Sequence, residues 1–293
     1  MRCFLAGFTL LLVAGCSASK ASQVNGDPVL GYADAPRAVR TLLDKSGMEP
    51  ELKAAGARLA VGRHVVVAGD VGDTALSEMA HIGDAAVAEV DDLAGQTSHG
   101  RVLILAPQTQ SDFASWGGAG YDDVYGLTQP PSWKDAPSVI TLDLANAGLG
   151  AVTLEADGNL LRHVIAHEMF HALTLPVGGS KVPLWLTEGF AEVAGERMRD
   201  IPHPEVTWQA ALPTDAQFDA DPQNAYFLAW QLAAYLQRHE GPARAMRFYF
   251  AALSPYRHAS LNVLSRRDLG TPLKALVRRW KHTYDAKGPI GVY

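Results

Sequence analysis

The sequence predicts an α+β protein in which a small mixed β-sheet comes first and helices follow. Residues 64–68 are a β-branched run and residues 101–106 an aliphatic run, so each is expected to form a buried strand, while 139–144 alternates as a half-buried strand does. From residue 160 onward the apolar residues recur at helical spacing. Strands followed by a run of helices are typical of the α+β class. We therefore expect one domain over residues 36–293, with a mixed lobe at 36–159 and a helical lobe at 160–293.

The composition is that of a folded globular chain. Of 293 residues, 48% are hydrophobic and 19% are charged, which argues against wholesale disorder. The formal net charge is −6, so there is no general case for binding nucleic acid. We expect no nucleic-acid partner.

The first residues have the pattern of an export signal. Arg2 provides a positive start, and residues 4–14 form an apolar stretch that is too short to cross a bilayer. The segment LVAGC at residues 12–16 resembles a bacterial lipobox. In lipoproteins of that kind the signal is removed before the cysteine, whose sulfur then carries a diacylglycerol. An ordinary signal followed by a chance cysteine is the alternative.

The lipobox resemblance has consequences for location and for cysteine chemistry. It implies a signal peptide at residues 1–15, contact with membrane lipid through Cys16, and a lipid-anchored protein on the extracytoplasmic face of the cell membrane. Cys3 and Cys16 are the only cysteines, so the mature chain would keep one, and that one lipidated. No disulfide is then expected, and catalysis by cysteine is excluded.

The elements of the N-terminal half follow from spacing and from glycine and proline. Residues 16–35 are mostly small and polar with Gly and Pro, and are expected to form a tether. Residues 36–59 show weak helical spacing, whereas 75–93 place apolar residues along one face, as an amphipathic helix does. Residues 107–137 are rich in Gly, Pro, Asp and Trp. They predict a long irregular stretch with a short helix at 110–116, and such loops are often functional.

Five helices are expected in the C-terminal half. The first covers 160–175 and has Asp157 or Asn159 as its cap; a Pro/Gly breaker at 176–179 ends it. A second helix follows Pro183 and runs from 184 to about 198. Three more begin near prolines, at 222–239, 242–253 and 272–284.

The first of these helices contains the pattern His-Glu-x-x-His at residues 167–171. Residues four apart lie on one helix face, so the imidazoles of His167 and His171 can bind one Zn²⁺ at about 2 Å each. Glu168 lies beside the pair, where its carboxylate can take a proton from water whose pKa the metal lowers to about 7. The motif also occurs on ordinary amphipathic helices. Here the neighbouring residues are apolar, and an imidazole pair buried without a partner would be costly.

A third ligand is needed, and the next helix offers one. In the metzincin pattern a Gly and a His would stand where this chain has Thr174 and Val177, so that class is excluded. The segment WLTEGFAE at residues 185–192 resembles the helix that follows the His-Glu-x-x-His helix in the gluzincins, more narrowly the peptidase MA-like and aminopeptidase-N-like sequences. The resemblance implies a gluzincin-like fold with one zinc ion held on two packed helices by His167, His171 and Glu188.

The resemblance also suggests roles for residues around the ligands. Glu192 stands one turn after Glu188, where a carboxylate of the family hydrogen-bonds a ligating histidine; a solvated carboxylate is the alternative. Tyr226 is the candidate oxyanion donor, with simple packing as the alternative, and Tyr235 is a weaker candidate. His163, one turn before His167, is expected to be partly exposed and without a role in metal binding; a place behind the metal ligands is the alternative.

These residues together predict a zinc-dependent peptidase that acts on a peptide or protein substrate, with Glu168 as the general base. The family's Gly-x-Met-Glu-Asn type of exopeptidase motif is missing, which slightly favours cleavage within chains. One alternative is a catalytically silent zinc-binding surface lipoprotein that serves as a binding or scaffold module. Another is a cell-envelope interaction module without metal.

Overall fold

The computed structural model describes residues 29–98, 100–121, 124–134, 136–145, 154–175, 182–199, 209–254 and 256–289. The expected signal peptide, Cys16, most of the tether and the breaker at 176–179 lie outside these residues. Among the helices of the described ranges, none combines the length and the hydropathy that a membrane span requires.

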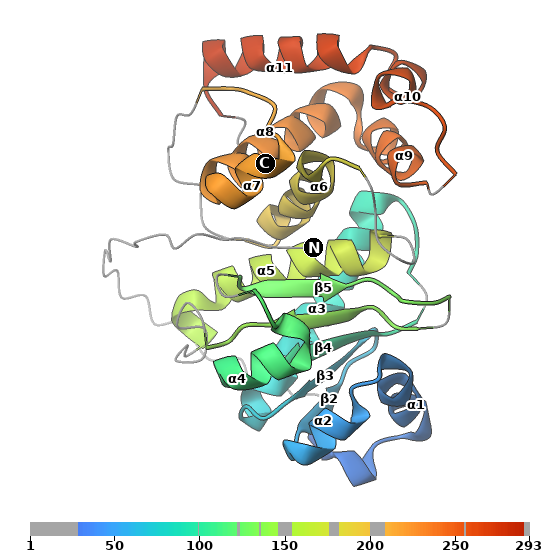
Figure 1. Cartoon of the computed structure of the whole chain (residues 1–293), viewed down its shortest axis with the longest axis vertical. Coiled ribbons are helices and arrows are strands. Elements are labelled where there is room, and N and C mark those ends of the chain that lie inside the picture. Colours follow the sequence, from blue (N-terminus) through green and yellow to red (C-terminus); the bar gives the residue numbers. More distant parts are fainter. Residues whose placement is uncertain are drawn as a thin grey trace.

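A six-stranded mixed sheet lies in the lower half of the molecule as drawn in Figure 1. Its spatial order is β1-β2-β3-β4-β6-β5. The three central strands β3, β4 and β6 run parallel, and the outer pairings are antiparallel. The strands are β1 (Val29–Gly31), β2 (Arg58–Val61), β3 (Val65–Gly69), β4 (Val102–Ala106), β5 (Gly126–Gln129) and β6 (Val139–Leu142).

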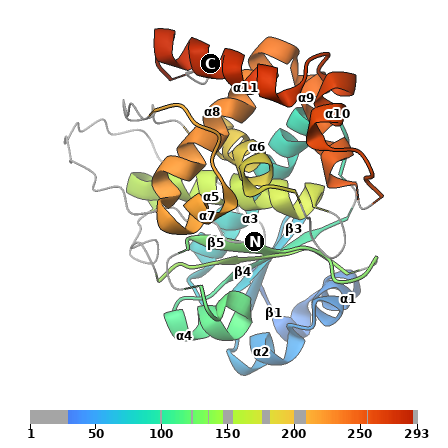
Figure 2. The same ribbon diagram turned by 45° about the horizontal axis from the view of Figure 1, so that its top comes forward.

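Helices cover both faces of the sheet, which is why its central strands are apolar on both sides. One face carries α1 (Arg37–Ser46), α2 (Glu49–Ala54), and the α4 segment (Gln110–Phe113) with a π-turn at Ala114–Gly118. The opposite face carries α3 (Asp73–Ala94) and α5 (Leu154–Thr174), as Figure 2 shows.

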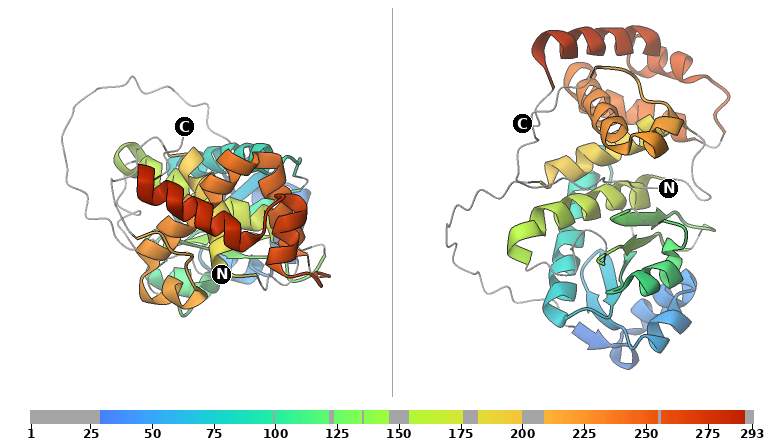
Figure 3. Two further views of the ribbon diagram at one scale, coloured as in Figure 1. Left: turned by 90° about the horizontal axis from the view of Figure 1, so that it is seen from above. Right: turned by 60° about the vertical axis from the view of Figure 1, so that its left-hand side comes forward.

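The remaining helices are stacked on α5, away from the sheet. They are α6 (Leu184–Arg197), α7 (Asp215–Ala220), α8 (Pro222–Glu240), α9 (Pro242–Leu253), α10 (Leu261–Asp268) and α11 (Leu273–Lys287). The right-hand view of Figure 3 shows the sheet, α5, α6, α8 and α11 in succession. One hydrophobic cluster runs through these layers, from Ile104 in the sheet to Trp280 in α11. The expected order, a mixed sheet first and helices after it, is confirmed.

Several local expectations are wrong, and each concerns short elements or helix ends. The helix α5 begins at Leu154, so Asp157 and Asn159 lie inside it and do not cap it. Val29–Gly31, expected to belong to the tether, pairs with β2 as β1. The stretch expected to be irregular contains β5, which pairs with β6 at the edge of the sheet. Strands of three or four residues are too short to show a periodicity, so only their tertiary partners reveal them.

One weak helical stretch is predicted over residues 36–59, but the structure divides them into α1, α2 and the start of β2. The helices α7 and α10 were also not anticipated, since each has eight residues or fewer. The longer elements agree with their expected positions to within a few residues at most ends: β3, β4, β6, α3, α6, α8, α9 and α11.

Candidate metal centre

Two packed helices, α5 and α6, supply the side chains of the centre. His167, Glu168 and His171 come from α5, and Glu188 comes from the first half of α6. The neighbour of that glutamate, Gly189, lies where α6 meets α8. A Cβ at this position would come within 2.4 Å of the backbone oxygen of Ala229, so only glycine permits the close approach.

Three ligand atoms converge between the helices. The Nε2 atoms of His167 and His171 lie 3.1 Å apart. Glu188 Oε2 lies 3.2 Å from the first nitrogen and 3.3 Å from the second. Ligands that surround zinc tetrahedrally at about 2.0 Å are separated from one another by about 3.3 Å. The three atoms therefore have the spacing of three corners of such a site, and together they can hold a metal ion.

The donor set also fits a metal chemically. All three side chains are at most 2% exposed. His167 Nδ1 lies 3.0 Å from Glu192 Oε1, and a carboxylate there favours a proton on Nδ1. Nε2 then keeps its lone pair, which points toward the other two ligand atoms. The residues of this site thus fit zinc, with two neutral imidazoles and one carboxylate as donors.

Glu188 is ionised in this environment. Burial opposes its ionisation, but the charge and hydrogen bonds of His171 and His167 outweigh burial and lower its pKa to about 2. Its second oxygen, Oε1, has no hydrogen-bond partner among the described residues.

Glu168 is buried next to the edge strand β5. Thr128 Oγ1 lies 2.6 Å from Glu168 Oε2 and donates a hydrogen bond to it, which fixes the carboxylate. Glu168 Oε1 has no hydrogen-bond partner among the described residues. A Cβ on Gly126 would approach Glu168 Cγ to 2.9 Å and Val164 Cγ1 to 3.0 Å, so this glycine lets the strand lie close to the helix. No sequence pattern points to Thr128, because its strand of four residues lies in a stretch whose composition predicts an irregular loop.

Two tyrosines border the centre. Tyr226 of α8 is buried, and its ring centroid lies 6.2 Å from that of His167. Tyr249 of α9, which the sequence did not single out, packs against Phe170 and shares a hydrogen bond of 2.9 Å with Thr174. Burial raises the pKa of Tyr249, and the charge of Glu188 adds to this effect. The contact between the hydroxyls of Thr174 and Tyr249 joins residues far apart in the chain, so no sequence pattern predicts it.

Tyr235, the weaker candidate for the oxyanion donor, packs against His239 with ring centroids 4.3 Å apart. Within the described part of the chain, Tyr235 has no hydrogen bond or ring contact with His167, His171 or Glu188. Of the two tyrosines proposed from sequence, Tyr226 is the one whose ring lies beside a ligand.

Two further expectations concern residues behind the ligands. His163 is 1% exposed, so the expectation of a partly exposed side chain is wrong. Its ring nitrogens lie 3.3 Å from Glu192 and 3.1 Å from Glu196. Glu192 is 5% exposed and lies against His167, so the solvated alternative for this carboxylate does not hold.

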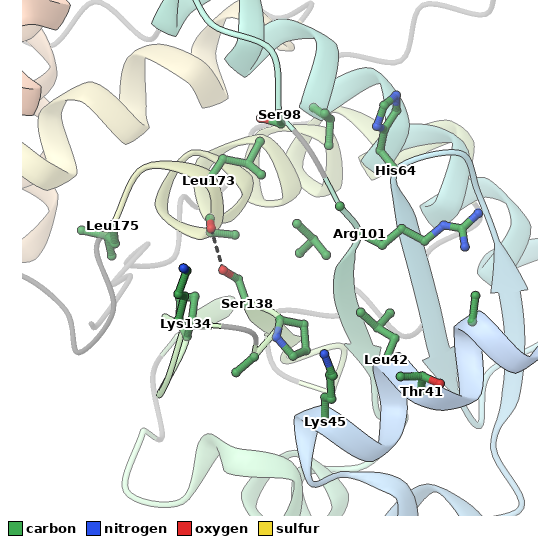
Figure 4. Close-up of a pocket in the computed structure, with 18 of the residues that line it drawn as sticks. Thr41, Leu42, Lys45, His64, Ser98, Arg101, Lys134, Ser138, Leu173 and Leu175 are labelled. Atoms are coloured by element: carbon green, nitrogen blue, oxygen red, sulfur yellow. Dashed lines mark hydrogen bonds between the residues drawn. The ribbon is translucent and has the colours of Figure 1, made fainter.

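A separate pocket of about 670 Å³ lies near the end of α5 (Figure 4). None of His167, Glu168, His171 or Glu188 lines it. Ser138, at its centre in the figure, donates a hydrogen bond of 2.6 Å to the backbone oxygen of Ala172. Among the described residues that line the pocket the cations are Lys45, Arg101 and Lys134, and none of these described residues carries a carboxylate.

Comparison with known proteins does not assign a family. No family model matches the chain, and no curated protein matches its sequence. Function is therefore argued from the geometry and chemistry of the site.

Proposed function

We propose that the protein is a zinc-dependent peptidase of the gluzincin type. The observation that carries the proposal is the convergence of His167 Nε2, His171 Nε2 and Glu188 Oε2 to within 3.1–3.3 Å of one another. Beside them stands Glu168, a carboxylate with one oxygen held by Thr128. Three protein ligands with an adjacent carboxylate are typical of hydrolytic zinc sites, which keep a fourth position open.

The chain's own residues have defined tasks in this reaction. His167, His171 and Glu188 would hold a zinc ion, which would polarise the substrate carbonyl and lower the pKa of water to about 7. Glu168 accepts a proton from the attacking water and returns it to the leaving amine. Thr128 orients Glu168 through its bond to Oε2, which leaves Oε1 for proton transfer. Tyr226, near His167, is the proposed donor to the developing oxyanion.

The edge strand β5 supports a peptide as the substrate. It pairs with β6 on one side only, and no described strand pairs with its other edge. An extended peptide can add to such an edge through main-chain hydrogen bonds. Because β5 also carries Thr128, which holds Glu168, a peptide bound there would lie close to the general base.

The location proposed for the enzyme comes from the lipobox at residues 12–16. A diacylglycerol on Cys16 would anchor the protein on the extracytoplasmic side of the membrane. Labelling of cells with a radioactive fatty acid, for the full chain and for Cys16→Ser, tests the anchor separately from the peptidase activity.

The peptidase proposal is tested by comparing the wild type with Glu168→Gln. Both proteins should bind one zinc ion per chain, measured by elemental analysis, because Glu168 is not a ligand. Cleavage, profiled on a proteome-derived peptide library, should fall roughly 10²- to 10⁴-fold in Glu168→Gln, as expected when a general base is lost. Glu51→Gln, which alters an exposed carboxylate of α2, is the matched control and should cleave normally.

Cleavage by Glu168→Gln at the wild-type rate would show that Glu168 is not the base. Equimolar zinc without cleavage by the wild type would instead support the silent zinc-binding lipoprotein. A wild type that binds no zinc would defeat both proposals.

A further inference from the structure

A line of buried ionisable side chains extends from the metal centre between α5 and α6. His167 Nδ1 lies 3.0 Å from Glu192 Oε1, whose other oxygen lies 3.3 Å from His163 Nε2. His163 Nδ1 then lies 3.1 Å from Glu196, which lies 3.2 Å from Arg199 Nη1. Each side chain between His167 and Arg199 is at most 7% exposed. The proposed reaction uses none of His163, Glu196 and Arg199.

The charges of this line balance one another. Buried carboxylates are tolerated when they are paired and hydrogen-bonded. Burial opposes a charge on His163, but Glu192 and Glu196 outweigh it and raise its pKa to about 9. Glu192 lies between His163 and His167, and Glu196 lies between His163 and Arg199. Two carboxylates thus face two cations, His163 and Arg199.

The helix α6 makes room for the imidazole. A Cβ on Gly195 would lie 2.8 Å from His163 Cε1, 2.9 Å from its Nδ1 and 3.0 Å from its backbone oxygen. The ring is therefore held directly against the backbone of α6, with a carboxylate on each side. This placement restricts His163 to the orientation in which it reaches both Glu192 and Glu196.

We propose that His163 and Glu196 are positioning residues for the metal centre. They hold Glu192 as an oriented carboxylate, and Glu192 in turn keeps the proton of His167 on Nδ1 and its Nε2 lone pair directed at the metal. The inference rests on the zinc site of the proposed function. Partners behind a metal ligand fix its tautomer and commonly change metal affinity 10- to 100-fold when they are removed.

A second metal ion is the competing explanation, since His163, His167 and Glu192 also form a group that can hold one. The contacts favour the positioning role. Both nitrogens of His163 face carboxylates, as those of an imidazolium do, and His167 would have to lose both of its ring protons to bind two ions.

The test measures zinc affinity in the full chain, by competition with a chelator, for the wild type, His163→Gln and Glu196→Gln. The matched control is Arg197→Gln, since Arg197 lies next to Glu196 on α6 but pairs with Glu89 and Asp92 of α3. We expect His163→Gln to bind zinc roughly 10-fold more weakly than the wild type, and Arg197→Gln to bind it equally well. Glu196→Gln, which leaves the imidazole in place, should weaken binding in the same direction.

A spectroscopic readout separates positioning from general stability. In the zinc-free wild type, ¹⁵N chemical shifts of His167 should report a proton on Nδ1, and in His163→Gln a larger share on Nε2. Unchanged zinc affinity and tautomer in His163→Gln would overturn the inference while leaving the peptidase proposal standing. An equal loss of affinity in Arg197→Gln would also overturn it. Two zinc ions in the wild type and one in His163→Gln would show a second metal site instead.

Discussion

His167 and His171 stand one helical turn apart, and this spacing brings their rings together on one face of α5. Their ring centroids are 4.8 Å apart with planes at 77°, so the rings meet edge to face while both Nε2 atoms point to one place. Glu188 reaches the same place from another helix. Because a site with three protein ligands keeps only two donors after one is removed, the loss of one ligand is expected to affect metal binding strongly.

The substitution His171→Ala removes one of the three donors and should abolish stoichiometric zinc binding. Elemental analysis of the purified variant after dialysis measures this directly. His258→Ala is the control, because His258 is exposed and lies beyond α9, and it should retain one ion per chain. Zinc retained at one equivalent in His171→Ala would remove this histidine from the ligand set.

At the scale of elements, α6 is the helix that assembles the centre, since it contacts α5 on one side and α8 on the other. The helix α6 carries a glycine on each of these two sides. Gly189 faces the backbone of Ala229 in α8, and Gly195 faces His163 in α5. The two glycines are six positions apart in the helix, which places them about 120° apart around its axis. Small residues at these positions set how deeply α6 can insert, and therefore where Glu188 lies.

Gly189→Ala should push α6 away from α8. Its Cβ would come within 2.4 Å of the Ala229 backbone oxygen, which cannot rotate aside as a side chain could. We expect a loss of roughly 1–3 kcal/mol in the free energy of unfolding, as is usual for overpacking, together with weaker zinc binding. Urea denaturation measures the first effect and chelator competition the second.

The control for this substitution is Gly72→Ala. A Cβ at Gly72, the N-cap of α3, would meet nothing within 4 Å, so zinc affinity should not change and stability should fall only by the cost of replacing a glycine cap with alanine. If Gly189→Ala behaves like Gly72→Ala, the close contact between α6 and α8 does not govern the site.

At the scale of the whole molecule, the ionisable groups lie deep inside one continuous core. The helix α5 is covered by the sheet on one side and by α6 on the other, and both helices contribute to the same hydrophobic cluster. Charges in such a position are stable only when they are compensated. The compensation depends on protonation, so the stability of the fold should depend on pH.

His163 has a pKa of about 9 in the folded protein. Loss of its proton should lower the free energy of unfolding of the zinc-free protein as the pH rises through this value. Burial opposes its charge, but Glu192 and Glu196 raise its pKa above the ordinary value of 6.5. A group whose pKa is higher in the folded state stabilises fully below its unfolded pKa and loses this contribution as the pH rises through the folded value. Urea denaturation of the wild type and His163→Gln at both ends of this window measures the effect. The free energy of unfolding of the wild type should exceed that of the variant at the lower pH, and this difference should shrink at the alkaline end. A difference that stays constant with pH would contradict the prediction.

The long elements and the pairing of His167 with His171 could be predicted from the sequence alone. Both follow from local rules: apolar periodicity defines a helix or strand of sufficient length, and residues four apart share a helix face. For the same reason the helix start at Leu154 and the short strand β5 escaped prediction, since neither leaves a local pattern.

Which side chains meet across elements depends on how the helices and strands pack, and no sequence pattern predicts it. Thr128 reaches Glu168 because β5 lies along α5, and His163 reaches Glu192 and Glu196 because α6 packs against its ring. A partly exposed histidine was expected at position 163, yet it is buried. Contacts between residues far apart in the chain depend on how the layers pack and on where small residues allow them to approach. This packing cannot be predicted from the local patterns of a single sequence.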